Sequence, residues 1–214
     1  MSGRQGRNMK IERYALGSLG TNCYLVENEK TKELVIVDPA DCPDYMISYV
    51  KRIGYEPKAI LLTHGHFDHV MGISGWKKEF DIPVYIHKDE VQILKNPALN
   101  LSSMFGTSYA YEDVVCLEDK EMLELIGYTF EVIHTPGHTS GSCCYYVKDE
   151  EVLFSGDTLF CRSVGRSDFP TGSAATLVRS VKERLFCLPE QVMVYPGHND
   201  LTCIADEKQY NPFV

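Results

Sequence analysis

Apolar runs alternate with polar turns along most of the chain, and the period of each run separates expected strands from expected helices. Runs of strand type cover 9–17, 22–28, 33–40, 58–63, 82–88, 128–135, 142–149, 151–157 and 191–197. Runs with helical spacing cover 42–55, 69–80 and 173–188. Strands interleaved with a few helices predict an α/β layered domain.

The segment 88–124 has the weakest pattern in the chain, and we expect it to form a helix followed by a long loop. Phe105 and Tyr109 lie in this loop, and one of them is expected to approach a substrate cleft as part of a lid. Residues 1–8 are expected to be a flexible tail or a cloning remnant. Residues 9–214 are then expected to form a single domain.

The composition narrows the range of functions. With 214 residues, of which 44% are apolar and 24% charged, the chain is long enough to bury a sizeable core. Its 21 Lys and Arg against 30 Asp and Glu give a formal net charge of -9, which disfavours a general role on nucleic acid or anionic lipid. No window reaches the roughly 18 apolar residues of a membrane span, and the N-terminus has no secretory core, so a cytoplasmic protein is expected. A small molecule is the expected partner, and a homodimer is left open.

The eight cysteines are expected to be reduced rather than disulfide-bonded. Most lie inside apolar runs, as Cys23, Cys143, Cys144 and Cys187 do, and none forms a CxxC pair. This distribution is typical of small buried thiols in a reducing compartment.

Candidate metal ligands lie at the ends of several expected strands. Three histidines and an aspartate occur within residues 64–69, HGHFDH, directly after an apolar run. His138, Asp157 and His198 each follow a further apolar run. Strand ends at one edge of a sheet lie side by side, so these residues can converge on one rim.

The spacing within the first cluster predicts two metal ions rather than one. His64 and His66 lie two residues apart, so in extended backbone both side chains can point toward one cation. Asp68 and His69 would point elsewhere, toward a second cation. Imidazoles suit zinc or iron, and a carboxylate with two oxygens can bridge two ions, a role that fits Asp157. The expected ligand sets are His64, His66, His138 and Asp157 for one metal, and Asp68, His69, His198 and Asp157 for the other.

The motifs THGHFDH, TPGHT, FSGDTLF and YPGH occur in this order and strongly resemble those of the metallo-β-lactamase-fold hydrolases. The stretch GRSDFPTGS and the ending EKQYNPF look like the glyoxalase II-like branch of that family. The resemblance extends over nearly the whole chain from Met9 onward. It implies a four-layer αββα sandwich with a dinuclear site on its rim, and the ligand positions named above match the family's metal ligands.

The same resemblance limits the reaction. Zinc β-lactamases of this fold commonly have a cysteine where Asp157 stands, and flavodiiron proteins have a carboxylate where His66 stands. Cleavage of β-lactams and reduction of oxygen are therefore disfavoured. Larger glyoxalase II enzymes carry a C-terminal helical domain that helps to hold glutathione, and this chain ends at Val214, roughly where that domain would begin. Recognition of glutathione is left open.

The chemistry of the expected site favours a thioester substrate. Two divalent ions about 3.5 to 4 Å apart share a water, lower its pKa to about 7 and present a hydroxide nucleophile at neutral pH. A thioester expels a thiolate whose conjugate acid has a pKa near ~8.5, so no strong general acid is needed. We therefore expect a dinuclear thioesterase of the glyoxalase II type, with Asp157 bridging the metals and Asp68 orienting the hydroxide. Zinc is the expected metal, with iron and manganese as alternatives.

Other classes of function stay open from the sequence. A mononuclear iron persulfide dioxygenase is similar over the same motifs, and His64, His138 and Asp157 could furnish its site. A non-catalytic binding module that keeps metal for stability is disfavoured by the complete ligand set. A tRNA-processing nuclease would share the ligands, but the acidic charge argues against it. Arg166, in GRSDFP, is expected either to pin its loop or to meet an anionic substrate.

The remaining candidate residues are expected to be structural. His87 lies far from any ligand motif, and Trp76 has the helical spacing of a core residue. His134 is expected to pack or to support the site. Asp38, at the end of an apolar run, is expected to have a structural or supporting role. Cys161 is expected to be a buried thiol.

Overall fold

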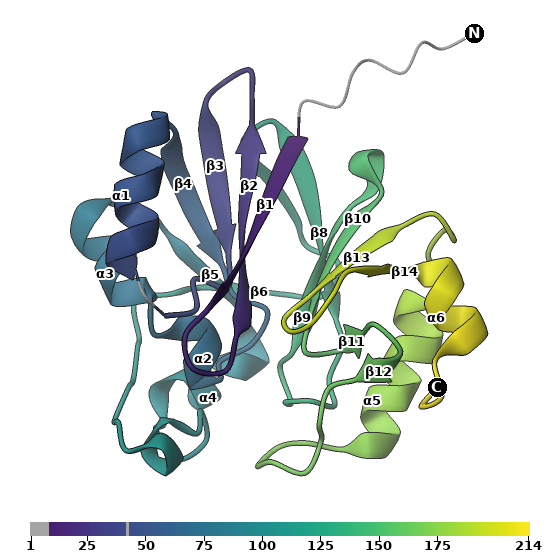
Figure 1. Cartoon of the computed structure of the whole chain (residues 1–214). Coiled ribbons are helices and arrows are strands. Elements are labelled where there is room, and N and C mark those ends of the chain that lie inside the picture. The colour runs from purple at the N-terminus through teal and green to yellow at the C-terminus, as the bar shows by residue number, and fades with distance from the viewer. Residues whose placement is uncertain (1–8, 42) are drawn as a thin grey trace, which may run out of the picture.

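Two six-stranded β-sheets pack face to face, with helices on their outer sides (Figure 1). The computed structural model describes residues 9–41 and 43–214. The first sheet has the order β1-β2-β3-β4-β5-β6, whose strands cover Met9–Leu16, Thr21–Asn28, Glu33–Val37, Glu56–Leu61, Val84–His87 and Val115–Leu117. The second sheet has the order β14-β13-β10-β9-β8-β7, whose strands cover Thr202–Cys203, Met193–Pro196, Val152–Gly156, Cys143–Val147, Tyr128–His134 and Met122–Leu125. A two-stranded hairpin of β11 (Leu159–Phe160) and β12 (Ser163–Val164) follows β10.

The helices form the two outer layers (Figure 1). The first sheet is covered by α1 (Pro43–Ile53) and α3 (Ile73–Glu79), and the second by α5 (Ala174–Ser180), the π-helical turn η4 (Val181–Leu185) and α6 (Ile204–Tyr210). The shorter elements are α2 (Phe67–Val70), α4 (Val91–Lys95), η1 (Lys88–Glu90), η2 (Ser102–Phe105) and η3 (Lys148–Glu150). This arrangement confirms the predicted αββα sandwich. Within the described residues, no helix has the length and apolar character needed to cross a bilayer.

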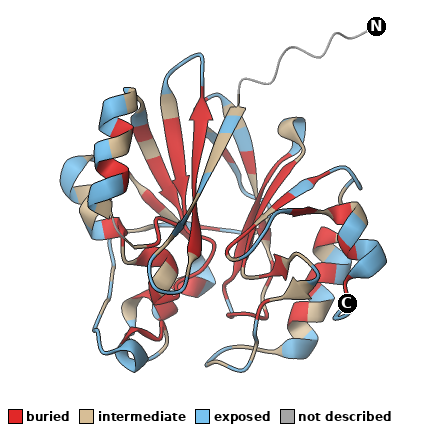
Figure 2. Cartoon of the chain, viewed as in Figure 1, coloured by how far each residue is buried: buried red, intermediate tan, exposed pale blue. Residues whose placement is uncertain are grey.

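The central strands bury both faces, because successive side chains point to opposite sides of a sheet. In β2, Cys23 and Leu25 belong to a hydrophobic cluster with α1 and α3, whereas Tyr24 and Val26 belong to the cluster between the sheets. The same alternation continues in β3, β4, β9 and β10. Figure 2 shows the buried strands in red between helices whose outer faces are exposed. Three hydrophobic clusters therefore hold the four layers together.

Hydrogen bonds also join the two sheets. The hydroxyl of Tyr145 donates to the carbonyl oxygen of Leu62 at 2.8 Å, just beyond the end of β4. The hydroxyl of Tyr24 donates to the carbonyl oxygen of Pro196 at 2.6 Å, at the end of β13. Because a buried polar group is costly to leave unpaired, these bonds fix how the strand ends of the two sheets meet.

Two predicted helices differ in detail from the structure. The predicted helix 69–80 is two helices, α2 and α3, which are separated at Met71 and Gly72. A Cβ at Gly72 would lie 2.7 Å from the carbonyl oxygen of Pro39. The loop after β3 therefore packs directly against the backbone between α2 and α3. The predicted helix 173–188 is α5 continued by the π-helical turn η4.

The segment 88–124 contains the expected helix, α4, and a loop, but it also contains β6 and the first three residues of β7. These strands have 3 and 4 residues, which is too short for alternation to be detected in the sequence. Helix α6 was not predicted either. The predictions for residues 1–8 and for Cys42 lie outside the described residues.

The described cysteines are free thiols. Cys23, Cys143 and Cys144 are buried, as predicted. The prediction for Cys187 was wrong, because this side chain is exposed just after η4, where its Sγ donates a hydrogen bond to the carbonyl oxygen of Arg184. A residue near the end of an apolar run can therefore be exposed, as Cys187 is.

Packing between the sheets can be tested at Phe154, which has no exposed surface there. Phe154→Ala is expected to lower the free energy of unfolding by about 3 to 5 kcal/mol, because it leaves a cavity between the sheets. Phe213→Ala is the control, since Phe213 is 57% exposed. Its effect should stay within about 0.5 kcal/mol in denaturant unfolding. Equal losses in the two variants would contradict this description of the core.

Candidate metal centre

The candidate ligands lie at the carboxyl ends of strands from both sheets. Strands β8, β10 and β13 run in the same direction, because β9 is antiparallel to both β8 and β10, and β13 is parallel to β10. The residues that follow these strands therefore come to one edge: His138, Asp157 and His198. In the other sheet, His64 and His66 follow β4, and α2 then carries Asp68 and His69.

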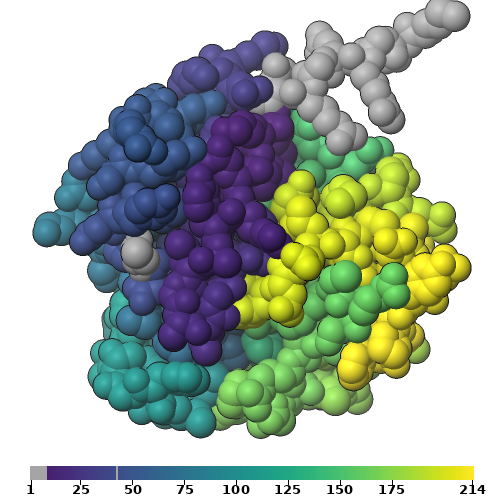
Figure 3. Space-filling model, in the orientation of Figure 1, coloured from purple at the N-terminus to yellow at the C-terminus, as the bar shows by residue number. Residues whose placement is uncertain are grey.

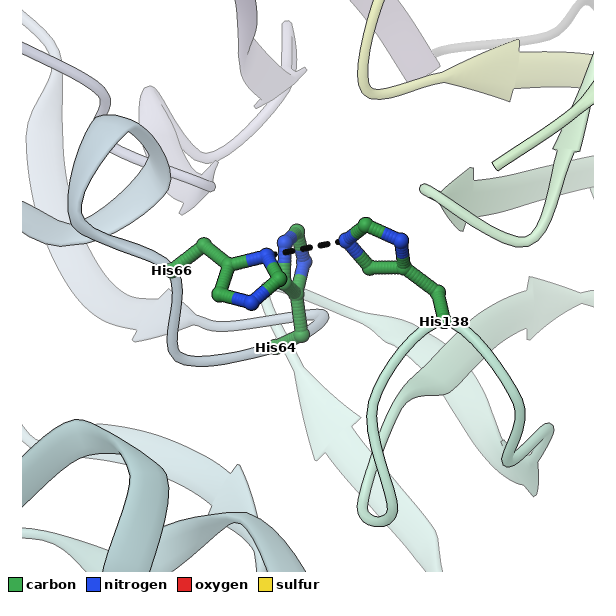
Figure 4. A group of neighbouring side chains, drawn as sticks. All are labelled: His64, His66 and His138. Carbon is green, nitrogen blue, oxygen red and sulfur yellow. Dashed lines mark hydrogen bonds between the residues drawn. The ribbon is translucent and has the colours of Figure 1, made fainter. Parts of the chain in front are cut away.

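Three imidazoles from two loops form the first donor group, which we call the first triad. One ring nitrogen from each of His64, His66 and His138 lies within 4.8 Å of the other two. Figure 4 shows the rings pointing toward one another, with His64 and His66 on one loop and His138 on another. Nδ1 of His66 lies 2.9 Å from Nε2 of His138. All three residues are buried, which leaves little access for water.

A carboxylate and two imidazoles form a second donor group, which we call the second triad. Asp68, His69 and His198 each place a donor atom within 4.8 Å of the others. Oδ2 of Asp68 lies 3.3 Å from Nε2 of His198 and 3.5 Å from Nε2 of His69. Thr21, at the start of β2, donates a hydrogen bond to this oxygen at 2.6 Å. The hydroxyl of Thr21 therefore fixes the orientation of the carboxylate.

Asp157 lies between the two triads. Its Oδ1 is 3.4 Å from Nε2 of His69, and its Oδ2 is 3.5 Å from Nε2 of His138 and 3.6 Å from Nε2 of His198. Gly197 leaves room for this carboxylate, because a Cβ there would lie 2.2 Å from Oδ1 of Asp157. One carboxylate thus faces both donor groups, as the bridging role expected of it requires.

Hydrogen bonds at the second ring nitrogen orient two of the histidines. Nδ1 of His138 donates to the backbone carbonyl of Arg166 at 2.6 Å, and Nδ1 of His69 donates to Oδ2 of Asp38 at 2.9 Å. In the neutral ring, each bond places the proton on Nδ1 and leaves Nε2 available to a metal. Asp38 also accepts hydrogen bonds from the backbone N–H and the hydroxyl of Thr63. Its contacts agree with the supporting role expected from the sequence.

Several buried donor atoms at this site lack a hydrogen-bond partner. Among the described residues they include Nε2 of His64, Nε2 of His66 and Oδ1 of Asp157. Nδ1 of His64 is paired with the hydroxyl of Thr63 at 3.2 Å, so Nε2 is the atom left to the triad. Buried polar atoms nearly always have a partner in the protein, water or an ion. Metal ions bound by both triads would satisfy Nε2 of His64 and Oδ1 of Asp157, whereas His66 faces its triad through Nδ1, so these residues fit a centre that holds two divalent ions.

The electrostatics of the site also suit cations. Burial, and then the neighbouring imidazoles, lower the pKa of His64 well below its usual value, so that its ring is neutral, as a metal ligand must be. Burial also lowers the pKa of His69, but the surrounding carboxylates, first Asp68, raise it to about 10. The carboxylates therefore stabilise positive charge in the second triad.

A cleft of about 170 Å³ opens over the two triads. Away from the triads it is lined by Leu19, Phe67, Leu101, Phe105, Arg166 and Phe169. The rings of Phe67 and Phe105 lie 4.5 Å apart. In Figure 3 the hairpin of β1 and β2, in purple, lies against the yellow segment that follows β13. Arg13 in β1 donates a hydrogen bond to the carbonyl oxygen of Asn199 in that segment. Leu19 lies at the tip of this hairpin and lines the cleft, so the hairpin forms part of the cleft wall.

Of the residues expected to contact a substrate, Phe105 and Arg166 line the cleft and Tyr109 does not. Tyr109 packs instead against the hydrophobic cluster under α1 and α3. The guanidinium of Arg166 donates two hydrogen bonds to Asp168, at 2.8 and 2.7 Å, and lies 3.8 Å from the centre of the Phe169 ring. Because its charge is paired and its carbonyl holds a ligand ring, Arg166 fits the role of a structural pin better than contact with an anion.

The side chains of His87, Asp89 and His134 also lie close together. The rings of His87 and His134 are stacked 4.1 Å apart and 11° from parallel. The lone pair of an imidazole nitrogen lies in the ring plane, so stacked rings cannot both direct one at the same ion. These contacts agree with structural roles for both histidines. Trp76 is fully buried in the core, whereas Cys161 is partly exposed rather than buried as predicted.

Two residues at the site had no signal in the sequence. Thr21 holds Asp68, and Glu90 accepts hydrogen bonds from both loops of the first triad. Neither residue belongs to a motif, and both are far along the chain from the groups they contact. The tertiary fold alone brings them to the site.

The chain matches the metallo-β-lactamase superfamily over residues 16–198 and belongs to that superfamily. It is 36% identical over 210 residues to the probable metallo-hydrolase YqgX of Bacillus subtilis, with 96% of this chain and 98% of YqgX covered. It is 31% identical over 209 residues to the hydroxyacylglutathione hydrolase GloC of Haemophilus influenzae, with 96% of this chain and 98% of GloC covered. The family predicted from the motifs is confirmed.

Solved structures show the same fold. The B3 metallo-β-lactamase BLEG-1 superposes with a TM-score of 0.91 at 40% identity, covering 95% of this chain and 99% of BLEG-1. A di-iron-bound form of TTHA1623 gives 0.85 at 36% identity, covering 95% and 100%. ETHE1 from Myxococcus xanthus gives 0.80 at 27% identity, covering 95% and 84%.

Asp157→Ala is expected to lose at least one of two bound metal ions, because its carboxylate faces both triads. Elemental analysis after dialysis of the folded variant measures the loss. Asp81→Ala, which removes an exposed carboxylate before β5, is the control and should keep full metal content. A fully metallated Asp157→Ala variant would contradict the bridging role.

Proposed function

We propose that this chain is a dinuclear metal-dependent thioesterase of the glyoxalase II type, which hydrolyses small-molecule thioesters with zinc as its metal. The proposal rests on the position of Asp157, whose oxygens lie 3.4 to 3.6 Å from ring nitrogens of both triads. The first triad and Asp157 would hold one ion, and the second triad and Asp157 the other. The name of GloC, a hydroxyacylglutathione hydrolase 31% identical to this chain, supports a thioester substrate.

The side chains at the rim orient the reactants. When bound, two divalent ions polarise a carbonyl and lower the pKa of a water to about 7. Thr21 holds Asp68 so that this carboxylate can accept a hydrogen bond from the attacking water. Asp38 keeps His69 in the tautomer with Nε2 free. The apolar walls of the cleft exclude other water from the reacting atoms.

The walls of the cleft favour a thioester over an amide. An amine leaving group needs a proton from a general acid, whereas a thiolate, whose conjugate acid has a pKa of about 8.5, leaves without one. Away from the triads, the described residues that line the cleft are apolar except for Arg166, whose guanidinium stays protonated. These walls therefore supply no neutral side-chain acid, which suits a substrate with a good leaving group.

The same walls favour an uncharged, apolar group next to the scissile bond. The cleft of about 170 Å³ is smaller than the roughly 300 Å³ at the lower end of small-molecule pockets, so it would hold only part of a substrate. Phe67, Leu101 and Phe105 offer it apolar surface. The charge of Arg166 is already paired with Asp168. We expect the acyl group to enter the cleft and the thiol portion to extend from it.

Other reactions are alternatives to this proposal. Hydrolysis of β-lactams is disfavoured by the aspartate at position 157, whereas the name of BLEG-1, a B3 metallo-β-lactamase 40% identical to this chain, supports it. An iron persulfide dioxygenase would use His64, His138 and Asp157, and the di-iron-bound form of TTHA1623 supports iron as a candidate metal. A non-catalytic binding module that keeps metal for stability is disfavoured, because the cleft opens directly onto both triads.

A matched pair of substrates tests the proposal. The zinc-loaded chain is expected to hydrolyse the propanoyl thioester of a simple thiol about tenfold better in kcat/KM than the lactoyl thioester, unlike the hydroxyacyl preference in the name of GloC, because a hydroxyl without a partner in an apolar wall costs about 1 to 3 kcal/mol. Release of thiol is followed with a chromogenic reagent. A β-lactam, and a persulfide with an oxygen electrode, are assayed in parallel. Turnover of either of these without thioester hydrolysis would contradict the thioesterase, and equal rates for the two thioesters would contradict only the acyl preference.

Phe105→Ala is expected to lower kcat/KM for the propanoyl thioester about fivefold, since it removes roughly 1 kcal/mol of apolar contact from a half-exposed ring. Metal content should stay the same, because Phe105 lies outside both triads. Met104→Ala is the control, since Met104 precedes Phe105 on η2 and is 67% exposed. Unaltered kinetics of Phe105→Ala would show that this ring is not part of a substrate wall.

A further inference from the structure

Glu90 is a buried carboxylate that the proposed chemistry does not use. It lies at the end of η1 and has no exposed surface. Its Oε1 accepts a hydrogen bond from the backbone N–H of Gly65 at 2.8 Å. Its Oε2 accepts one from the hydroxyl of Thr139 at 2.8 Å and one from the backbone N–H of Gly141 at 2.9 Å.

These hydrogen bonds reach both loops of the first triad. Gly65 lies between His64 and His66, and Thr139 directly follows His138. The two loops come from different sheets, one after β4 and the other after β8. Each oxygen of the carboxylate therefore holds one loop, and one side chain connects the two sides of the triad.

Glycines let the backbone around Glu90 approach these loops. A Cβ at Gly141 would lie 2.3 Å from the backbone nitrogen of Glu90, which is too close for any other residue. A Cβ at Gly65 would lie 3.0 Å from the backbone nitrogen of Leu94 in α4. Both backbone donors to Glu90 thus come from positions where η1 and α4 pack directly onto the loops.

Burial disfavours the ionised form of the Glu90 carboxylate. Burial raises the pKa of Glu90 to about 7, although the hydrogen bonds from Gly65, Thr139 and Gly141 act to lower it. An apolar side chain would avoid the cost of burying an acid, but it would leave the N–H groups of Gly65 and Gly141 and the hydroxyl of Thr139 without this acceptor. The partners of Glu90 therefore suggest a role at the metal centre rather than in packing.

We propose that Glu90 is a positioning residue that sets the geometry of the first triad by joining its two loops. It acts through the backbone and hydroxyl groups it accepts from, and it touches neither metal nor substrate. The inference rests on the metal centre of the proposed function, but not on the thioester as substrate. Residues that orient metal ligands typically change metal affinity about 10- to 100-fold when they are replaced.

Glu90→Gln tests the role in the full chain. Glutamine keeps the size of the side chain, but in either orientation its NH2 group faces an N–H donor, so one loop is released. Dissociation constants for the first and second zinc equivalents are measured by competition with a chromophoric chelator. One equivalent is expected to bind about 10- to 100-fold more weakly. The loss should persist in the His198→Ala background, where the second triad is incomplete.

Glu207→Gln is the matched control. Glu207 is 1% exposed and accepts hydrogen bonds from the backbone of Arg162, the hydroxyl of Thr202 and the amide of Asn211. It therefore has the same burial and a similar set of donors, but it holds no loop of the first triad. Its replacement should lower thermal stability and leave both zinc affinities unchanged.

Unchanged zinc affinities in folded Glu90→Gln, or an equal loss in Glu207→Gln, would overturn the proposal. If Glu90→Gln does not fold, Thr139→Val removes one donor to Oε2 and is expected to weaken one zinc equivalent about fivefold, which corresponds to one hydrogen bond. Unchanged affinity in that variant would overturn the proposal as well. Thioester hydrolysis is not measured here, so a wrong substrate leaves the test intact.

Discussion

Buried donor atoms that face one another without a partner are the constraint on which this structure depends. Nε2 of His64 and Oδ1 of Asp157 are in this state among the described residues, and Nδ1 of His66 lies only 2.9 Å from Nε2 of His138. Burying such atoms costs free energy unless they are paired, and cations are the partners that suit neutral imidazoles beside carboxylates. The carboxylates around His69, first Asp68, raise its pKa to about 10, because they stabilise positive charge at this rim. The rim of the sandwich is therefore built for metal ions.

The rest of the fold holds these donors in place. Three hydrophobic clusters set the layers, and the hydroxyls of Tyr24 and Tyr145 connect the strand ends of the two sheets. Closer to the donors, Asp38 and Glu90 accept hydrogen bonds from the ligand rings or their loops. The packed core thus holds the donor side chains in an arrangement that they would not adopt without it.

The convergence of the candidate ligands was predictable from sequence, because each of them follows a strand whose apolar pattern is local. Residues 64–69 come directly after β4, and Asp157 directly after β10, so the strand pattern predicted their convergence. Glu90 was missed because its partners lie in loops that only tertiary packing brings near it. Tyr109 was expected at the cleft, but the segment 88–124 carries little periodicity, and nothing in it indicates that this ring packs under α1 and α3. Substrate contacts are for the same reason less predictable than metal ligands.

The number and kind of metal ions bound by the purified chain test this account most directly. Elemental analysis without prior chelation should find about two ions per chain, mostly zinc, because two triads share one carboxylate. A single iron per chain would contradict the dinuclear centre. It would favour instead a site of two histidines and one carboxylate and the chemistry of an oxygenase.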